Sequence, residues 1–120
     1  MSVAITGIGV VSPYGVGRDR FWQCVSSGCS ATRTIAEFDA TPYGCTVAAP
    51  VPKVSIDDAV RIEQRAPGAP IERSGRPDPR RYSRASLIAV IAATEAWADA
   101  GLRIGEPNAG VLVGSGAGGI

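Results

Sequence analysis

Short apolar runs alternate with stretches of helical periodicity along this chain. Residues 3–6 form an apolar run that Gly7 ends, which predicts a buried strand followed by a tight turn. In residues 18–27 the apolar side chains recur at helical spacing, and Gly28 suits the left-handed position that ends a helix. Residues 46–51 predict a second strand, at a sheet edge because prolines stop further pairing there.

The longest helical pattern covers residues 79–100. Asp78 is the expected N-cap, Pro79 fits the first helical position, and Gly101 fits the position after the last turn. The middle of this helix is apolar on all sides, which predicts that it is buried between layers rather than lying on a surface.

The remaining segments complete an α/β pattern. Residues 110–114 predict a third strand, whereas residues 52–79, with five of the nine prolines, predict a surface segment with one short helical turn near residues 56–62. Alternation of strands and helices favours a parallel sheet, whose strands need cover on both faces. Because a glycine-rich loop follows the last strand, we expect an incomplete α/β architecture.

Composition narrows the class of protein. The 120 residues are 45% hydrophobic, which suffices for a core, and the net charge of +1 argues against a dedicated nucleic-acid binder. No apolar run approaches the roughly 20 residues of a membrane span. The N-terminus lacks the basic leader of a targeting signal, and three cysteines are an odd number for a disulfide framework. We therefore expect a cytoplasmic protein with reduced cysteines.

Catalytic and metal-binding side chains are scarce. The chain has no His, so it cannot form a Ser–His or Cys–His pair alone. Cys24, Cys29 and Cys45 lack the spacing of a zinc site, and none lies at a strand-to-helix elbow. The sequence therefore predicts no catalytic residue and no metal site within these residues.

Arginines concentrate ahead of the long helix. Between positions 73 and 84 there are five arginines against one acid, Asp78. A charge run is usually a solvated face, but Arg80, Arg81 and Arg84 are expected to share one face of the helix. Arginine suits carboxylate and phosphate groups, which favours an acidic protein partner.

Glycines in residues 114–119 match the G-x-G-x-x-G pattern of dinucleotide-binding proteins. That pattern is informative only where a helix and a later acidic residue follow, and neither follows here. A tight turn where the backbone passes close to another group is the favoured interpretation, and we expect no NAD(P) binding.

Several motifs together resemble one known family. Residues 3–15 (VAITGIGVVSPYG) resemble the opening of the β-ketoacyl-[acyl carrier protein] synthases. Phe21-Trp22, Ser27-Gly28 and Phe38-Asp39 are similar to later motifs of that family, in order. The closing stretches 98–102 (ADAGL) and 114–119 (GSGAGG) look like the same family, so the resemblance covers essentially the whole chain. The type resembled is the elongating, discrete ketosynthase of fatty-acid and type II polyketide synthesis.

The resemblance implies a thiolase-like layered αβαβα fold, of which residues 1–120 would form the N-terminal portion without the catalytic half. It implies a decarboxylating Claisen condensation of an acyl thioester with malonyl-acyl carrier protein, using a Cys and two His that lie beyond the matched segment. The family works as a dimer and needs no cofactor, because the phosphopantetheine arm belongs to the carrier protein. The alternative is a non-catalytic chain-length-factor subunit of a type II polyketide synthase heterodimer.

The resemblance also assigns roles to individual residues. Basic positions that dock the acidic carrier protein match Arg80 and Arg81, with Arg76 and Arg84 in the same cluster; another basic position of the family falls on Pro77, beside Arg76. The residue that lines the acyl pocket in the family matches Ala117, whose small side chain implies a roomier pocket. The 120-residue segment by itself is expected to be inactive and poorly soluble.

Overall fold

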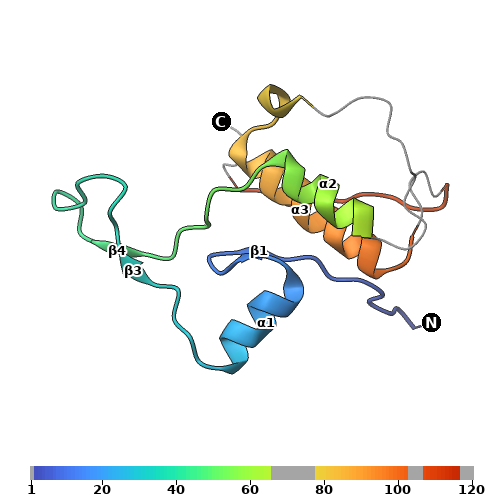
Figure 1. Cartoon of the computed structure of the whole chain (residues 1–120), viewed down its shortest axis with the longest axis horizontal. Helices are drawn as coiled ribbons and strands as arrows, with labels where there is room; N and C mark the ends of the chain where they lie inside the picture. The colour runs from blue at the N-terminus through green and yellow to red at the C-terminus, as the bar shows by residue number, and fades with distance from the viewer. Residues whose placement is uncertain (1, 66–77, 103–106, 117–120) are drawn as a thin grey trace.

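Helices and short strands alternate in the computed structural model, which describes residues 2–65, 78–102 and 107–116. Two hairpins of two-residue strands lie at opposite ends of the helix α1 along the chain, and a pair of packed helices follows (Figure 1). The elements in chain order are β1 (Val11–Ser12), β2 (Gly15–Val16), α1 (Arg18–Ser26), β3 (Arg33–Thr34), β4 (Val47–Ala48), α2 (Ile56–Arg65), the 3₁₀ turn η1 (Pro79–Arg81) and α3 (Arg84–Asp99).

The first hairpin turns the chain into α1. Strands β1 and β2 pair antiparallel, with Val11 opposite Val16, and α1 begins two residues after β2. The helix ends at Ser26, and Gly28 has a φ of 72°, so the predicted helix and its left-handed glycine are both confirmed. All the residues of α1 remain at least partly exposed, because little of the described chain packs on its outer face.

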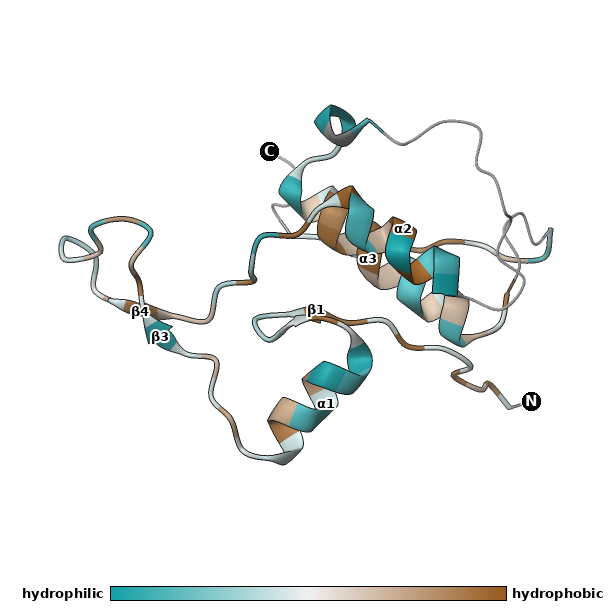
Figure 2. Ribbon diagram, in the orientation of Figure 1, coloured by the Kyte–Doolittle hydropathy of each residue, from teal (hydrophilic) through white to brown (hydrophobic). Residues whose placement is uncertain are grey.

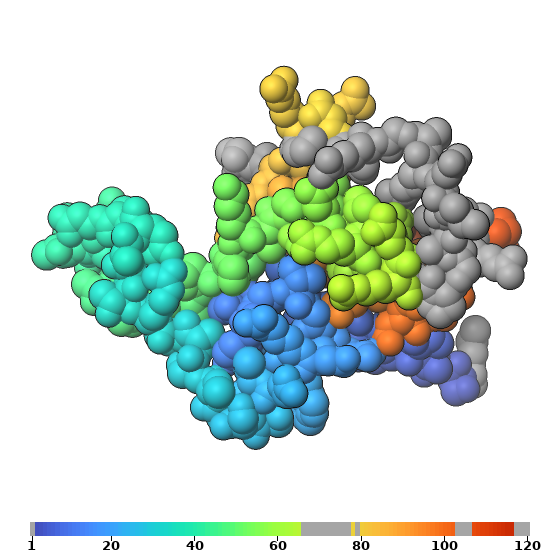
Figure 3. Space-filling model, in the orientation of Figure 1, coloured from blue at the N-terminus to red at the C-terminus, as the bar shows by residue number. Residues whose placement is uncertain are grey.

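The second hairpin stands apart from the helices. β3 and β4 pair antiparallel, with Arg33 opposite Ala48 and Thr34 opposite Val47. The strand predicted over residues 46–51 therefore exists, but it is shorter than predicted and its partner β3 was not expected. In the space-filling view the hairpin forms a lobe at the left of the molecule (Figure 3). Its tip is closed by the rings of Phe38 and Tyr43, which meet edge to face at 5.9 Å between centroids.

The hydrophobic core lies between α2 and α3. Its buried members are Val54, Ile56, Ala59 and Ile91, of which Ile91 is fully buried. α2 runs for ten residues and contributes Ile56 and Ala59 to this core, so it is longer than the single turn expected near residues 56–62. The sequence predicted a surface segment here because of its prolines and charged residues. Two aspartates and two arginines do lie on one face of α2, but the opposite face is apolar and packs in the core.

The long helix begins later than the sequence indicated. Residues 79–81 form η1, and α3 starts at Arg84 with Ser83 as its N-cap instead of Asp78. The predicted end is confirmed: α3 stops at Asp99 and Gly101 has a φ of 67°. Burial on all sides is wrong for the described chain, in which Ile91 is the one buried residue of α3. Within the described ranges, α2 covers one side of the helix and residues 7–12 contact another, and the rest of its surface stays exposed.

Two predicted strands are absent from the described chain. Residues 3–6 and 110–114 are extended or irregular, with Val3 96% and Leu112 101% exposed. Both appear in Figure 2 as hydrophobic stretches outside any helix or strand. The physical reason is that a strand needs a hydrogen-bonding neighbour, and no described segment pairs with either run. The result is a small mixed α/β structure. None of its described helices has the length and apolar character that a bilayer crossing requires.

Candidate functional site

The arginines ahead of α3 lie on two separate elements. Arg80 and Arg81 lie on η1, where the Arg80 backbone N–H donates to the Asp78 carboxylate at 3.0 Å and the Arg81 N–H to the Asp78 carbonyl at 3.1 Å. Asp78 thus starts η1 rather than the long helix. Both guanidinium groups are exposed and form no ion pair with any described residue.

Arg84 is held differently from the other two arginines. As the first residue of α3, it donates from Nη2 to the carbonyl oxygen of Val51 at 2.5 Å. The prediction that Arg80, Arg81 and Arg84 share one helical face is wrong, because the chain leaves η1 before α3 begins. The remaining two predicted site residues, Arg76 and Ala117, lie outside the described residues.

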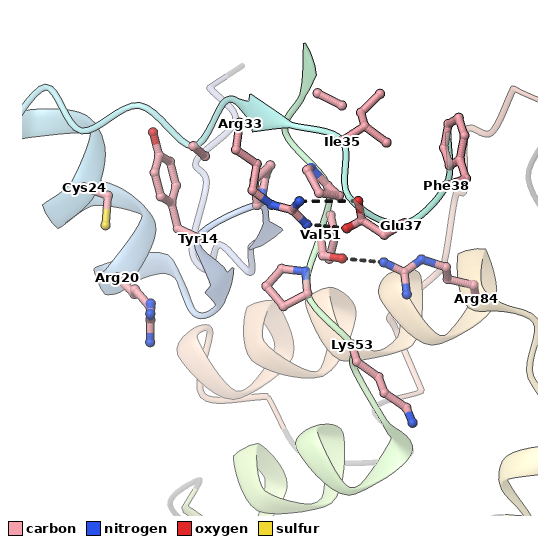
Figure 4. Close-up of a pocket in the computed structure, with 15 residues that line it drawn as sticks. Tyr14, Arg20, Cys24, Arg33, Ile35, Glu37, Phe38, Val51, Lys53 and Arg84 are labelled. Carbon is pink, nitrogen blue, oxygen red and sulfur yellow. Dashed lines mark hydrogen bonds and ion pairs between the residues drawn. The ribbon is translucent and has the colours of Figure 1, made fainter. Parts of the chain in front are cut away.

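A groove of about 960 Å³ lies between α1, the β3–β4 hairpin and the start of α3 (Figure 4). Arg20 of α1 lies on one side of it, and Arg84 and Lys53 lie on the other. Among its described lining residues, four are cations and one, Glu37, is an acid. The groove therefore carries a positive potential. The sequence pattern did not indicate it, because its lining residues lie up to 71 positions apart.

One of the four cations is neutralised. Both nitrogens of the Arg33 guanidinium fork donate to the two oxygens of Glu37, and the Ala36 backbone N–H donates to Glu37 Oε2 at 3.1 Å. The hydrogen bond from Arg33, and then that from Ala36, holds the pKa of Glu37 below its usual value. This pair therefore stays ionised near neutral pH and contributes no net charge, which leaves Arg20, Lys53 and Arg84 as the groove's effective cations.

Apolar side chains form the rest of the groove. Tyr14, Ile35 and Val51 are partly buried, whereas the Phe38 ring is 58% exposed. Tyr14 is fixed by its hydroxyl, which donates to the Cys29 carbonyl, and by a tilted contact with Phe21. The groove thus offers apolar surface next to positive charge, which suits an amphipathic acidic ligand.

Two carboxylates of α3 hold the N-terminal segment in place. Glu95 accepts the backbone N–H of Val10 at 2.7 Å and that of Arg18 at 2.8 Å, one on each oxygen. Asp99 accepts the N–H of Ile8 at 3.1 Å and a hydrogen bond from the Arg18 side chain. These contacts, first the Ile8 N–H and then Arg18, hold the pKa of Asp99 below its usual value.

Glu95 of α3 therefore caps the N-terminus of α1, although it lies 77 positions after Arg18 in the sequence. Gly17, the N-cap of α1, has no side chain to accept the first free N–H groups, and the Glu95 carboxylate takes that place. Glu95 and Asp99 lie four positions apart in the sequence, and so on one side of α3, but the sequence alone indicates no partner for either. The missed signal is a pair of acids on an otherwise apolar helix, one turn apart.

The glycines of the opening motif allow this close packing. A Cβ at Gly7 or Gly9 would run into the backbone carbonyls of Ala96 and Ala92, and at Gly9 it would also lie 2.7 Å from the Ala96 nitrogen. The motif thus serves helix packing in this structure, where the backbone of residues 7–9 lies against α3. The similar glycines near the end of the chain meet nothing within 4 Å at Gly114 and Gly116.

The cysteines are all free. Cys24 is partly buried at the edge of the groove, whereas Cys29 and Cys45 are exposed. In the described ranges no three His, Cys, Asp or Glu side chains come together as a metal site would require. The predicted absence of a catalytic residue and of a metal site within residues 1–120 stays a prediction.

Comparison with known proteins identifies one matching family and several related bacterial proteins. The model of the family described as "Beta-ketoacyl synthase, N-terminal domain" matches residues 1–120. The tetracenomycin polyketide synthase ketoacyl synthase alpha subunit of Streptomyces glaucescens is 34% identical over 119 residues, which are 97% of this chain and 25% of that protein.

Two further relatives come from other bacteria. The 3-oxoacyl-[acyl-carrier-protein] synthase 2 of Coxiella burnetii is 35% identical over 121 residues, which cover 98% of this chain and 26% of that protein. Its namesake from Staphylococcus aureus is 31% identical over 121 residues, with the same coverage of both chains. The chain spans about a quarter of the length of these curated relatives. The comparison with solved structures found no match to this chain.

Proposed function

The chain belongs to the β-ketoacyl synthase family, whose N-terminal-domain model matches residues 1–120, and we therefore propose that the whole protein is a ketosynthase. The resemblance of its motifs to that family is confirmed. The observation that carries the proposal is the match of the family model along all 120 residues.

The proposed reaction is a decarboxylative Claisen condensation. An acyl group is held as a thioester on a cysteine of the protein, and malonyl-acyl carrier protein loses CO₂. The resulting carbanion attacks the thioester carbonyl, forms the new C–C bond and releases the cysteine thiolate. Since these 120 residues contain no His, and their three cysteines occupy a mid-helix position and two loops, the reacting groups are assigned to the rest of the protein.

We propose that these 120 residues receive the carrier protein and support the reacting site in the rest of the protein. Arg80 and Arg81 on η1 are exposed and unpaired among the described residues, so an acidic partner can reach both. Arg76 and Ala117 keep their proposed roles in docking and in lining the acyl pocket. The proposed assembly is a dimer, with a second copy or a homologous subunit, in the cytoplasm, and the phosphopantetheine arm of the carrier protein is its only prosthetic group.

The test uses the full-length protein with malonyl- and acyl-carrier protein. We expect CO₂ release coupled to a β-ketoacyl product. Replacing Arg80 and Arg81 by Glu should raise the KM for malonyl-carrier protein at least tenfold at low salt, with a smaller effect as salt screens the charges. The matched substrate is malonyl-pantetheine, which has no protein surface, and its turnover should be unchanged by the same substitutions.

Three results decide between the readings. Equal loss with both substrates would show that the arginines act on folding or on the reacting groups, not on docking. Absence of condensation, together with assembly with a catalytic homologue, would favour the chain-length-factor subunit. Binding of NAD(P) without condensation would place the chain outside ketosynthase chemistry altogether.

A further inference from the structure

Apart from Arg84, no residue of the basic groove between α1, the β3–β4 hairpin and the start of α3 has a role in the function proposed so far. Arg20 and Lys53 are exposed, line opposite sides of it and form no ion pair with any described residue. Exposed, unpaired cations next to apolar side chains form a surface that attracts a negatively charged protein partner.

Arg84 connects the groove to the docking arginines. It lines the groove and is fixed there by its hydrogen bond to the Val51 carbonyl. It also follows Arg81 by three residues, so the two Cα atoms are at most about 11 Å apart along an extended chain. A partner helix of ten residues is about 15 Å long, and therefore long enough to contact η1 and the groove at once.

The chemistry of the groove defines the partner segment. Its cations require carboxylates along one edge of the ligand, and Phe38, Ile35 and Val51 require apolar side chains beside them. Such alternation is that of an amphipathic acidic helix. A small free anion would contact only the cations, and the apolar side chains of the groove would remain in contact with water.

We propose that this groove is a second contact site for the acyl carrier protein, in which Arg20, Lys53 and Arg84 receive an acidic amphipathic helix of the partner. The inference rests on the proposed function, because it takes the carrier protein as partner. It goes beyond that function by extending the docking surface from η1 across the start of α3 to α1 and to the segment that follows β4. The charge complementarity of the groove carries it.

The experiment measures the Kd of the full-length protein for the acyl carrier protein by titration calorimetry at two salt concentrations. The test variant is Arg20→Glu with Lys53→Glu. The control is Arg61→Glu with Arg65→Glu, two exposed arginines of α2 that lie outside both the groove and η1. Both variants change the net charge equally, so they alter the long-range attraction to the same extent.

We expect the groove variant to raise the Kd at least tenfold at low salt and the control to raise it less than threefold. The neutral variant Arg20→Gln with Lys53→Gln should give an intermediate loss and guards against misfolding caused by charge reversal. Circular dichroism melts of all variants check that the fold persists.

The outcomes separate this inference from the proposed function. If the Arg80/Arg81 variant loses affinity and the groove variants match the control, the groove proposal is overturned while docking at η1 stands. If no variant loses affinity, both fail. If the groove variants instead abolish self-association in sedimentation experiments and leave carrier binding intact, the groove's occupant is a second copy of this chain and our assignment is wrong.

Discussion

Residues 7–10 approach α3 closely because Gly7 and Gly9 have no side chain, and two carboxylates of α3 accept hydrogen bonds from this segment. Gly9 presents no Cβ to the helix, and its neighbours donate their N–H groups to the carboxylates of Glu95 and Asp99. At the scale of single residues, the sequence predicted only a tight turn at Gly7, and it placed a close backbone approach at the glycines of residues 114–119 instead. It could not name α3 as the neighbour, because the contact joins residues 85–91 positions apart.

Replacing Gly9 by Ala should therefore destabilise the protein. The added methyl group would overlap the Ala92 carbonyl and lie 2.7 Å from the Ala96 nitrogen, both of them helix backbone that cannot move aside locally. We expect the free energy of unfolding to fall by about 1–3 kcal/mol, as in overpacked interiors. Urea denaturation followed by circular dichroism measures it.

Gly44→Ala is the matched control. A methyl group at Gly44 meets nothing within 4 Å, and the residue has no positive φ, so its replacement should leave stability unchanged or slightly increased. Equal losses at both positions would contradict the packing argument for Gly9.

The start of α3 is decided at the scale of an element. Asp78 followed by proline is a good local signal for a helix start, and the chain does begin a helical turn there. The turn ends after Arg81, however, and Ser83 in an extended conformation caps the long helix with its hydroxyl, which accepts the Ser86 N–H at 3.2 Å. Two consecutive start signals compete in this sequence, and local pattern alone does not rank them.

Ser83→Ala tests which signal caps α3. Loss of the hydroxyl leaves the Ser86 N–H without its acceptor, and we expect a loss of about 1 kcal/mol in stability. Amide hydrogen exchange in the first turn of α3, near Ser86 and Leu87, should become faster by the corresponding factor.

Asp78→Ala is the comparison for that change. It removes the acceptor of the Arg80 N–H and should loosen η1 only, with exchange in α3 unaltered. Faster exchange in α3 on loss of Asp78, and none on loss of Ser83, would restore the start that the sequence indicated.

The whole molecule exposes more surface than a compact domain of its mass. Its accessible surface is 9277 Å², against about 6,100 Å² expected for a folded monomer of 12.3 kDa. The radius of gyration is 16.7 Å, compared with about 14 Å for a compact chain of this length. Large apolar side chains contribute to the surplus, including Val3, Ile5, Trp22, Val111, Leu112 and Val113.

We therefore expect the 120-residue chain, produced by itself, to bind an apolar fluorescent dye strongly and to aggregate at low concentration. A polypeptide of the relatives' full length should bind several-fold less dye per mole, because the two exposed apolar runs would gain strand partners and cover. Dye fluorescence and light scattering measure both. A monomeric 120-residue chain with weak dye binding and a sharp melting transition would disprove this prediction.

Features set by neighbouring residues could be read from the sequence: the extent of α1 and the left-handed glycines that end α1 and α3; the motifs along the chain also identified its family. Only the tertiary structure decided that Glu95 caps α1, that α2 and α3 form the core, and that Arg20, Lys53 and Arg84 surround one groove. These features join residues from about 30 to 77 positions apart, and local sequence preference carries no information about such contacts. The apolar residues 3–6 and 110–114 illustrate the difference. Their hydrophobicity favours burial, but a segment becomes a strand only where a neighbouring segment pairs with it.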